Sequence, residues 1–226
     1  MIRLGIIGTG NIASSGHAQA LLSSRKAQLW SVLSRDLGRA KDFARTYKAQ
    51  SLTPAFDSFK EFLSDPDLDG VIVTSPDNLH FEHGMLVAKH KKPMLMEKPF
   101  VTNFEQGSEL LQYCKSNQVT LAIGYHLRWH RGHQTMLRAI RAGEIGKVLL
   151  VRVLWTWKAA DASNWRAQAD LGKWWSLAGV GTHCLDLARW IIGEDENAVT
   201  SIQGQTSSPI FGSKHDELAT LQLKTK

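Results

Sequence analysis

Short apolar runs alternate with amphipathic stretches from residue 1 to about residue 125. The apolar runs have the length of buried strands and cover residues 4–7, 28–33, 70–73, 93–96 and 120–123. Between them, apolar positions recur at helical spacing over residues 11–24, 36–47, 58–63, 81–89 and 104–116. Strands that alternate with helices in this way predict a doubly wound parallel sheet. We therefore expect an α/β, Rossmann-type domain over residues 1–125.

Residues 126–226 have a mixed pattern. Apolar positions at helical spacing predict a helix over residues 134–142. A strand-like segment rich in Val, Leu and Trp follows over residues 147–158, and residues 200–205 and 218–224 alternate as strands do. We expect a second, smaller α+β domain over residues 126–226.

The composition is that of an ordinary folded chain: of 226 residues, 43% are hydrophobic and 21% are charged. We expect no membrane partner, because the longest apolar stretch is short and is broken by Arg152. No signal peptide is recognisable at the start. The two cysteines, Cys114 and Cys184, do not suggest a disulfide framework. These features favour a cytoplasmic protein.

The net charge of +6 favours anionic partners such as phosphorylated cofactors, and it would also suit nucleic acid. The basic residues are dispersed, however. Their densest run, Lys89-His90-Lys91-Lys92, is typical of a helix C-terminus, where cations meet the negative end of the dipole. Without a basic stripe and interleaved aromatic residues, we expect no nucleic-acid partner.

A glycine-rich turn follows the first predicted strand and opens the first helix. It reads Gly8-Thr9-Gly10-Asn11-Ile12-Ala13, the G-x-G-x-x-A form of the dinucleotide fingerprint. In this pattern Gly8 permits a tight turn, Gly10 lets the backbone approach a pyrophosphate, and Ala13 allows close helix–strand packing. The first N–H groups of the helix then face the phosphates. The alternative is a glycine turn without a ligand.

The end of the second strand distinguishes NAD from NADP. An acidic residue there would bind the ribose hydroxyls, whereas an arginine would accommodate a 2′-phosphate. The sequence is Leu33-Ser34-Arg35-Asp36. Ser34 can donate a hydrogen bond and Arg35 can pair with a phosphate, so we expect NADP to be preferred, with NAD possible as the cofactor. Asp36 leaves two alternatives, a contact with the ribose or an N-cap of the next helix.

Further motifs follow the other predicted strands. They are Thr74-Ser75-Pro76-Asp77-Asn78-Leu79-His80, Glu97-Lys98-Pro99, Gly124-Tyr125-His126-Leu127-Arg128, Gly143-Glu144-Ile145-Gly146-Lys147, Asn164-Trp165-Arg166 and the segment 181–190 around His183. With the glycine turn, they make residues 2–193 resemble the Gfo/Idh/MocA family of NAD(P)-dependent oxidoreductases, which act largely on sugars and cyclitols.

The resemblance implies roles for individual residues. Lys98 would lie beside the nicotinamide and the substrate hydroxyl, and His183 would be the acid/base. The cofactor site would be lined by Gly8, Thr9, Gly10, Asn11, Ile12, Ser34, Arg35, Ser75, Pro76, Asn78, His80, Glu97, Lys98, His126, Trp165 and Arg166.

These roles agree with elementary chemistry. Oxidation of a secondary alcohol requires that the hydroxyl proton leave as hydride passes to the cofactor. A neutral histidine such as His183 can take that proton, and a lysine ammonium such as Lys98 can polarise the oxygen. The structural alternatives are a solvated lysine at a strand end and a histidine that only fills the core.

One position departs from the family pattern. The aspartate that commonly lies four residues before the histidine is Gly179 here, and Lys173-Trp174-Trp175-Ser176 replaces the preceding glycine pair. His183 then works with less support, Lys98 carries more of the chemistry, or the reaction has changed. Asp186, three residues further on, could contact His183, although a position on the helix surface or between domains is the more natural interpretation.

The resemblance also implies that the second domain is an open, mainly antiparallel sheet. The chain is shorter there than is usual in the family, which fits either a short natural form or a fragment. A truncated sheet exposes an edge that can pair with another chain. We therefore expect a homo-oligomer.

Two features of the sequence suggest other functions. The spacing of His126, His130 and His133 suggests a metal site, but no carboxylate completes it. A nucleotide-binding sensor or regulator without catalysis is the second, and Gly179 favours it. The presence of both Lys98 and His183 favours an enzyme that transfers hydride between NADP(H) and a polyhydroxylated small molecule.

Overall fold

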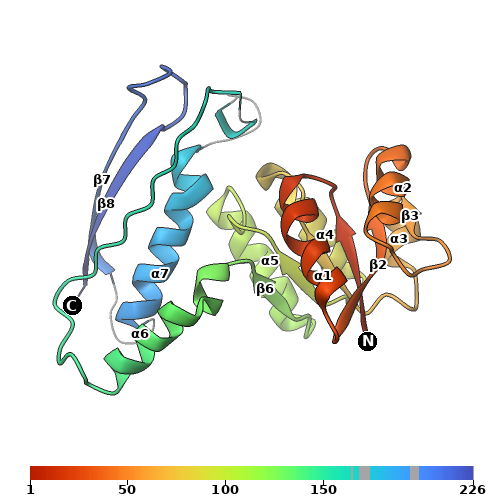
Figure 1. Cartoon of the computed structure of the whole chain (residues 1–226), viewed down its shortest axis with the longest axis horizontal. Helices are drawn as coiled ribbons and strands as arrows, with labels where there is room; N and C mark the ends of the chain where they lie inside the picture. The colour runs from red at the N-terminus through yellow and green to blue at the C-terminus, as the bar shows by residue number, and fades with distance from the viewer. Residues whose placement is uncertain (164, 168–173, 194–198, 226) are drawn as a thin grey trace. The chain divides into compact units, whose positions relative to one another are not determined.

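A six-stranded parallel sheet forms the centre of residues 1–124 (Figure 1). The computed structural model describes residues 1–163, 165–167, 174–193 and 199–225, and the chain divides into two compact units, 1–124 and 125–226. The strand order is β3-β2-β1-β4-β5-β6, with every neighbouring pair parallel. The strands are β1 (Ile2–Ile7), β2 (Ala27–Leu33), β3 (Ala55–Phe56), β4 (Gly70–Val73), β5 (Met94–Met96) and β6 (Leu121–Ile123).

Helices connect these strands and cover both faces of the sheet. They are α1 (Gln19–Ser23), which continues a π-helical segment (Ala13–Ala18), α2 (Leu37–Thr46), α3 (Phe59–Leu63), α4 (His80–Lys89), which follows a 3₁₀ turn (Asp77–Leu79), and α5 (Phe104–Ser116). Three begin at a polar N-cap: the side chains of Asp36, Ser58 and Asn103 each accept a hydrogen bond from the backbone N–H three residues on.

Two apolar layers hold the first unit together, one on each face of the sheet. Alternate strand residues explain this division, because Ile6 and Ile7 point to opposite layers. One layer joins the sheet to α1 and α2, and the other joins it to α3, α4 and α5. The prediction of a doubly wound parallel sheet is confirmed.

The second unit contains a pair of helices and a two-stranded antiparallel sheet (Figure 1). Its elements are a 3₁₀ turn (His126–Trp129), α6 (Arg131–Arg141), a second 3₁₀ turn (Trp165–Ala167), a π-helical segment (Leu177–Gly181), α7 (Thr182–Ile192), β7 (Val199–Ser207) and β8 (Leu218–Thr225). The α+β character and the antiparallel sheet agree with the prediction.

The predicted strand over residues 147–158 is wrong. In the part of the chain that the structure describes, this segment joins neither sheet. A strand requires a backbone partner, and the described ladder of this unit consists of β7 and β8. Leu149, Leu150 and Leu154 are more than 80% exposed as a result.

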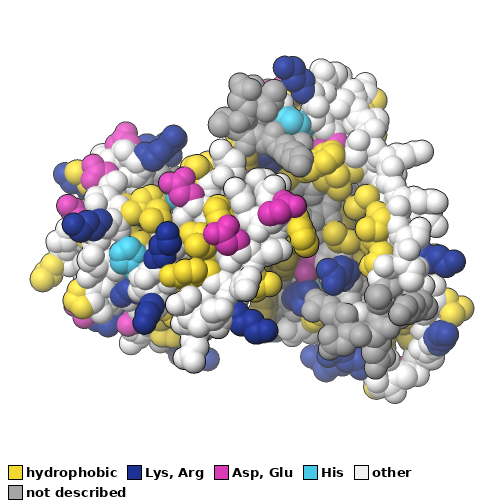
Figure 2. Space-filling model, turned by 180° about the vertical axis from the view of Figure 1, so that it is seen from behind, with side chains coloured by type: hydrophobic (Ala, Val, Ile, Leu, Met, Phe, Trp, Pro, Cys, Tyr) yellow, Lys and Arg dark blue, Asp and Glu magenta, His cyan; other side chains and the backbone are white. Residues whose placement is uncertain are grey.

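The surface of the second unit exposes hydrophobic side chains, which lie on the right in Figure 2. The segment 146–159 lines an apolar cleft of about 1580 Å³ together with residues of α7 and β8. Among the described residues, no helix is both long enough and apolar enough to cross a membrane.

Candidate active site

The carboxyl ends of the parallel strands gather the candidate cofactor residues of the first unit. The chain runs from β1 outward to β3 and then returns to place β4 on the other side of β1, so the switch point of the sheet lies between β1 and β4. Ligands of open α/β sheets bind outside the strand ends at such a switch point. The Thr74 backbone N–H and hydroxyl both donate to the Ile7 carbonyl oxygen, at 2.9 Å each. These bonds fasten the loop after β4 to the turn after β1.

The glycine-rich turn follows β1. Gly8 has a φ of 97°, and a Cβ there would lie 3.0 Å from the Thr74 carbonyl oxygen, so the turn requires glycine. A Cβ at Gly10 would meet no atom within 4 Å. Ala13 is fully buried. The three remaining candidates of this turn are partly or fully exposed: Thr9, Asn11 and Ile12. The turn has open space beside its backbone, and it therefore fits the pyrophosphate of a dinucleotide.

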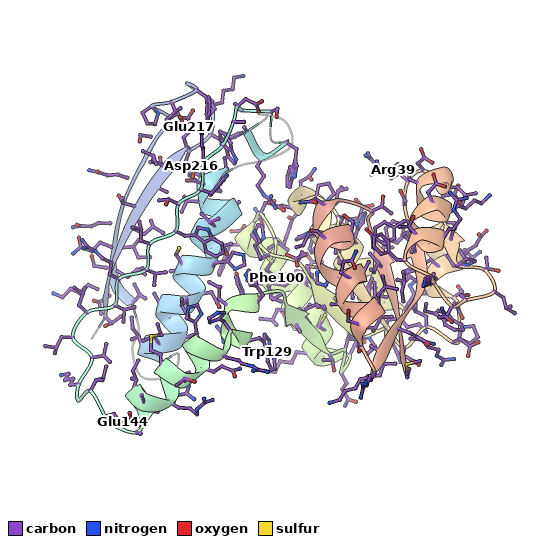
Figure 3. The ribbon with its side chains drawn as sticks, viewed as in Figure 1. Arg39, Phe100, Trp129, Glu144, Asp216 and Glu217 are labelled. Carbon is purple, nitrogen blue, oxygen red and sulfur yellow. The ribbon has the colours of Figure 1, made fainter. Side chains whose placement is uncertain are left out.

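The end of β2 places Ser34, Arg35 and Asp36 at the same edge of the sheet. Ser34 is half-buried and Arg35 is exposed. Asp36 caps α2, because its Oδ1 accepts a hydrogen bond of 3.0 Å from the Arg39 backbone N–H. Figure 3 labels Arg39 on this helix. Of the two alternatives for Asp36, the structure shows the N-cap.

The loop between β4 and α4 contains buried and exposed candidates. Ser75 and His80 are buried, whereas Pro76 and Asn78 are exposed. His83 joins this group, since its Nδ1 lies 2.9 Å from the Ser75 hydroxyl oxygen. Burial, and secondarily repulsion by His80, lowers the pKa of His83 to about 4. His83 is therefore neutral at physiological pH.

The loop after β5 carries Glu97 and Lys98. Glu97 is buried, and its Oε1 lies 2.9 Å from His17 Nε2 of the π-helical segment. The Lys98 backbone N–H donates to the other carboxylate oxygen at 3.2 Å. Burial alone would raise the pKa of Glu97, but these hydrogen bonds and nearby positive charges hold it below its usual value. An ionised carboxylate thus lies beside Lys98, whose side chain is half-buried.

The second unit surrounds His183 with aromatic rings. His183 is in the first turn of α7 and is only 3% exposed. The Trp155 ring stacks on it at a centroid distance of 5.4 Å and an angle of 25°, and the His126 ring meets it edge-on at 4.7 Å. Tyr125 approaches at 6.0 Å, and its hydroxyl lies 3.0 Å from the Thr182 hydroxyl oxygen. Burial, which outweighs the hydrogen bond with Thr182, raises the pKa of Tyr125, so this phenol is neutral.

Asp186 is engaged by Arg128 rather than exposed on the helix surface. Its carboxylate is buried and accepts from Arg128 Nε at 2.9 Å and from Arg128 Nη2 at 2.6 Å. The surface position expected for Asp186 is therefore wrong. A Cβ at Gly179 would lie 3.4 Å from the ring of Trp157, in ordinary contact. The position that commonly holds an aspartate in the family that the motifs resemble therefore faces an aromatic ring here.

Asp216 holds the beginning of the helix that carries His183. Its carboxylate accepts from the Trp175 backbone N–H at 2.8 Å, from the Leu177 backbone N–H at 2.7 Å and from the Ser176 hydroxyl. Figure 3 shows Asp216 near this end of the helix, just before β8. The side chain acts as an N-cap from a distant part of the sequence. It accepts hydrogen bonds from backbone N–H groups that have no partner within the helix.

The last family motif is described in part. Trp165 and Arg166 lie in a 3₁₀ turn, with the Arg166 guanidinium 4.2 Å from the centroid of the Trp165 ring. Asn164 and Lys173 lie outside the described residues.

The histidines considered as metal ligands have other contacts. His130 and His133 have ring centroids 4.7 Å apart, and His133 Nδ1 lies 3.1 Å from the Leu127 carbonyl oxygen. Within the described ranges, no group of three or more His, Cys, Asp or Glu side chains could hold a metal ion.

Sequence reasoning missed three neighbours of the candidate residues: His17, Trp155 in its contact with His183, and Arg128 as the partner of Asp186. His17 could have been found, since it lies one turn after Ala13 on the helix that the glycine turn opens. The contact of Trp155 gave no signal, because it joins residues 28 positions apart across an irregular segment.

Two family models match the chain. The model of the oxidoreductase family with an NAD-binding Rossmann fold matches residues 2–125, and that of the GFO/IDH/MocA C-terminal domain matches residues 133–226. A solved structure with the same fold is that of the WlbA dehydrogenase from Bordetella pertussis in complex with NADH and UDP-GlcNAcA. Its TM-score is 0.82 at 22% identity, over 99% of this chain and 63% of that chain.

Curated relatives include two named dehydrogenases. The chain is 27% identical over 214 residues to the glucose-6-phosphate 3-dehydrogenase of Bacillus subtilis (strain 168), covering 93% of this chain and 59% of that protein. It is 27% identical over 199 residues to the myo-inositol 2-dehydrogenase of Thermotoga maritima, covering 88% and 57%. The chain spans 54–62% of the length of these and the other curated relatives compared. The matched models, which confirm the resemblance seen in the sequence motifs, show that the chain belongs to the Gfo/Idh/MocA family of oxidoreductases.

Proposed function

We propose that this protein transfers a hydride between NADP(H), or NAD(H), and a hydroxyl or carbonyl carbon of a sugar, cyclitol or similar polyol. The observation that carries the proposal is the shared edge of the sheet, where the Gly8–Ala13 turn and the Lys98 loop follow strands β1 and β5. The names of the relatives, a glucose-6-phosphate 3-dehydrogenase and a myo-inositol 2-dehydrogenase, support the substrate class.

The cofactor would be held along that edge. The backbone of Gly8, Gly10 and Asn11 would bind the pyrophosphate, Ser34 and Arg35 would bind the adenosine end, and Lys98 would lie at the nicotinamide end. The nicotinamide supplies the hydride acceptor for oxidation and the hydride donor for reduction. The remaining candidates would line this path: Thr9, Ile12, Ser75, Pro76, Asn78, His80, Glu97, His126, Trp165 and Arg166.

We assign the transfer of the substrate's hydroxyl proton to His183. In the direction of oxidation, its imidazole would take the hydroxyl proton of the substrate, and the nicotinamide, when bound, would supply the hydride acceptor. The Lys98 ammonium would donate a hydrogen bond to the substrate oxygen and stabilise its growing negative charge. The His126 and Trp155 rings would hold the His183 ring in place, and the stacked face of Trp155 would stabilise its cationic form.

The NADP preference rests on Arg35. Its guanidinium is exposed at the end of β2, where a 2′-phosphate would lie, and Asp36 is occupied in capping α2. A bidentate pair between a guanidinium and a phosphate is a strong charge-assisted interaction. The Asp36 carboxylate, which already accepts a hydrogen bond from the helix, is less available to bind the ribose hydroxyls of NAD.

A second function, a nucleotide-binding sensor or regulator without turnover, is favoured by one observation. Gly179 removes the carboxylate that commonly supports the histidine, and Trp157 lies next to its position. Nucleotide binding without turnover of any sugar, cyclitol or polyol in a broad screen would favour this sensor function.

The variants Lys98→Ala and His183→Ala test the enzyme. Each should lower kcat/KM for the best substrate by at least about 100-fold, because each removes a group that acts in the transition state. Their affinity for NADPH, followed by quenching of tryptophan fluorescence, should stay within about threefold of wild type, since remote contacts supply most of the binding energy. Full activity in either variant would contradict the assignment.

Matched controls are available on the exposed end of α4. Lys89→Ala and His90→Ala change the same residue types outside the candidate site, and both positions are exposed. Each should keep wild-type turnover and NADPH affinity. A loss of activity in these controls equal to that of the site variants would indicate a general effect on folding.

We also propose that the protein works as a cytoplasmic homo-oligomer. Both cysteines are free thiols. In the described part of the second unit, β7 and β8 form a two-stranded sheet, so each has one side without a strand partner. Such edges favour pairing between chains. Light scattering after size exclusion should give at least twice the monomer mass of 25.2 kDa.

A further inference from the structure

His80 lies where two loops of the first unit meet. It is the first residue of α4, and its side chain is fully buried. Its Nδ1 lies 2.8 Å from the Pro99 carbonyl oxygen and 3.2 Å from that of Phe100, which Figure 3 labels. Its Nε2 lies 2.9 Å from the Ser75 carbonyl oxygen. Both ring nitrogens therefore face backbone carbonyl groups, which come from different loops.

These partners determine the form of the ring, because carbonyl oxygens accept hydrogen bonds and cannot donate them. A neutral imidazole has one N–H, so its other nitrogen would direct a lone pair at a carbonyl oxygen. An imidazolium donates on both sides. We propose that His80 is held as an imidazolium that clamps the loop carrying Lys98 to the loop that follows β4. The proposal rests on the proposed function only for the role given to Lys98.

The ionisable side chains of the neighbouring elements are compatible with one buried cation. Asp77 is buried one turn before His80, and Glu97 is a buried carboxylate of the second loop whose pKa is held low. His83 of the same helix is neutral, with its pKa lowered to about 4 by burial and by His80. From α5, which packs on α4, the Cys114 thiol is neutral because burial raises its pKa. Lys98 is the other cation of these loops.

Two effects oppose a positive charge on His80: free N–H groups give the start of α4 a partial positive charge, and burial removes the water that would hydrate a cation. Charge-assisted hydrogen bonds to carbonyl oxygens act against both effects, and here they form at both nitrogens. In a neutral ring, one nitrogen and the carbonyl oxygen that faces it would lack a donor, which is costly in an apolar core. His83 differs from His80, because its Nδ1 faces a hydroxyl group, which can donate to a neutral ring.

The clamp extends a series of hydrogen bonds along the carboxyl edge of the sheet, where the cofactor would bind. The Thr74 hydroxyl donates to the carbonyl oxygens of Ile7 and Gly8 at 2.9 and 3.1 Å. The next residue, Ser75, accepts from His80, which also donates to the residues that follow Lys98. His80 is thus a positioning residue: it links the glycine turn to the Lys98 loop through atoms that need not touch a ligand.

The protonation of His80 can be observed directly by NMR of the 15N-labelled full chain. At pH 7.5 we expect protons on both ring nitrogens, seen as two N–H correlations that are assigned through the Cβ protons of His80. A single N–H, with the second nitrogen at the shift of an unprotonated ring, would overturn the proposal. The measurement needs neither a variant nor turnover, so its failure is distinct from a failure of the proposed enzymatic function.

The clamp itself is tested by amide hydrogen exchange. In His80→Gln, a single amide nitrogen cannot reach both loops, so exchange over residues 98–103 should become at least tenfold faster while α5 keeps its rates. His90→Gln, an exposed change at the end of the same helix, should keep wild-type rates throughout. Unchanged exchange over residues 98–103 in folded His80→Gln would overturn the clamp. Should that variant not fold, raising the pH of the wild type until one N–H correlation disappears gives the same comparison.

Discussion

Charged side chains at the carboxyl edge of the sheet differ in whether other groups of the protein already bind them. Asp36 is bound to the first turn of α2, and Glu97 is bound by His17 and the Lys98 backbone. The exposed guanidinium of Arg35 follows β2 directly. Because a carboxylate engaged in a cap is less available to a ribose, we expect Arg35 to govern the choice of nucleotide at this position.

The substitution Arg35→Ala should therefore separate the two nucleotides. We expect the Kd for NADPH to rise at least tenfold, since the loss of a charge-assisted pair with a phosphate removes about 1.4 kcal/mol or more. The Kd for NADH should change less than about twofold, because NADH has no 2′-phosphate. Both are measured by tryptophan quenching at fixed ionic strength.

Arg45→Ala is the matched control for this change. It removes an arginine from α2, the helix that follows Arg35, at a position where the side chain is 81% exposed and pairs with Asp42. Both affinities should stay at their wild-type values. An equal loss of NADH and NADPH binding in Arg35→Ala would contradict the NADP preference and assign the arginine to a part shared by both nucleotides.

The candidate residues found from sequence were those in local motifs. The glycine turn, the cap by Asp36 and the loop of Glu97 and Lys98 depend on neighbours within a few positions, so their spacing carries the signal. The pair of Arg128 and Asp186 joins residues 58 positions apart, and it gave no such signal. Its recognition requires that α7 be packed against the turn before α6.

Elements of the first unit follow their sequence pattern closely because each has a partner that the fold supplies. β4 and α5 have the predicted bounds, Gly70–Val73 and Phe104–Ser116. β3 is only two residues long, which is too short for any alternation to appear. The segment 147–158 has the composition of a strand but no ladder partner among the described residues, so the local pattern was not sufficient.

The spacing of apolar residues also could not predict two π-helical segments. One contains His17, whose ring reaches Glu97, and the other, Leu177–Gly181, comes just before His183. The wider turn of a π-helix rotates the following side chains relative to an α-helix, and such segments occur often at functional sites. A search for apolar positions at a spacing of 3.6 residues cannot detect this rotation.

The buried start of α4 predicts a pH dependence of stability. The pKa of His83 falls from 6.5 in the unfolded chain to about 4 in the folded one. Between these values the unfolded chain binds a proton that the folded chain does not, so the free energy of unfolding falls as the pH is lowered through this window. Above pH 6.5 the contribution is fully present. Allowing for partial exposure, we expect a loss of roughly 1–3 kcal/mol.

The measurement compares urea unfolding of wild type and His83→Gln at pH 7 and pH 4.5. The variant lacks this titration, so its free energy of unfolding should fall less than that of the wild type over the same interval. His90→Gln, in which an exposed histidine of the same helix is removed, should follow the wild type. Parallel losses in wild type and His83→Gln would show that His83 titrates alike in both states.

On the scale of the whole molecule, the two units differ in how much apolar surface they bury. Both large apolar clusters lie in the first unit, between Ile6 and Val119. The described residues of the second unit contribute few buried apolar side chains: Leu137, Ala167, Trp175 and Leu187. Since stability follows buried apolar area, the second unit should unfold more readily.

Tryptophan positions make this difference measurable. Of the eight tryptophans, Trp30 lies in the first unit and the other seven lie in the second. Tryptophan fluorescence thus reports mainly on the second unit, while far-UV circular dichroism reports on the helices of both. In urea, the fluorescence midpoint should precede the main circular-dichroism midpoint by about 1 M or more, which corresponds to a few kcal/mol at ordinary m-values.

The variant Trp30→Phe is the control for this assignment. It removes the one tryptophan of the first unit, and the early fluorescence transition should persist at the same urea concentration. A saturating nucleotide should shift the later transition upward, because binding at the sheet edge stabilises the first unit by mass action. Superimposed transitions at a single midpoint would mean that the two units unfold as one cooperative body. In that case contacts between the chain's two parts, and not the core of the first alone, would set its stability.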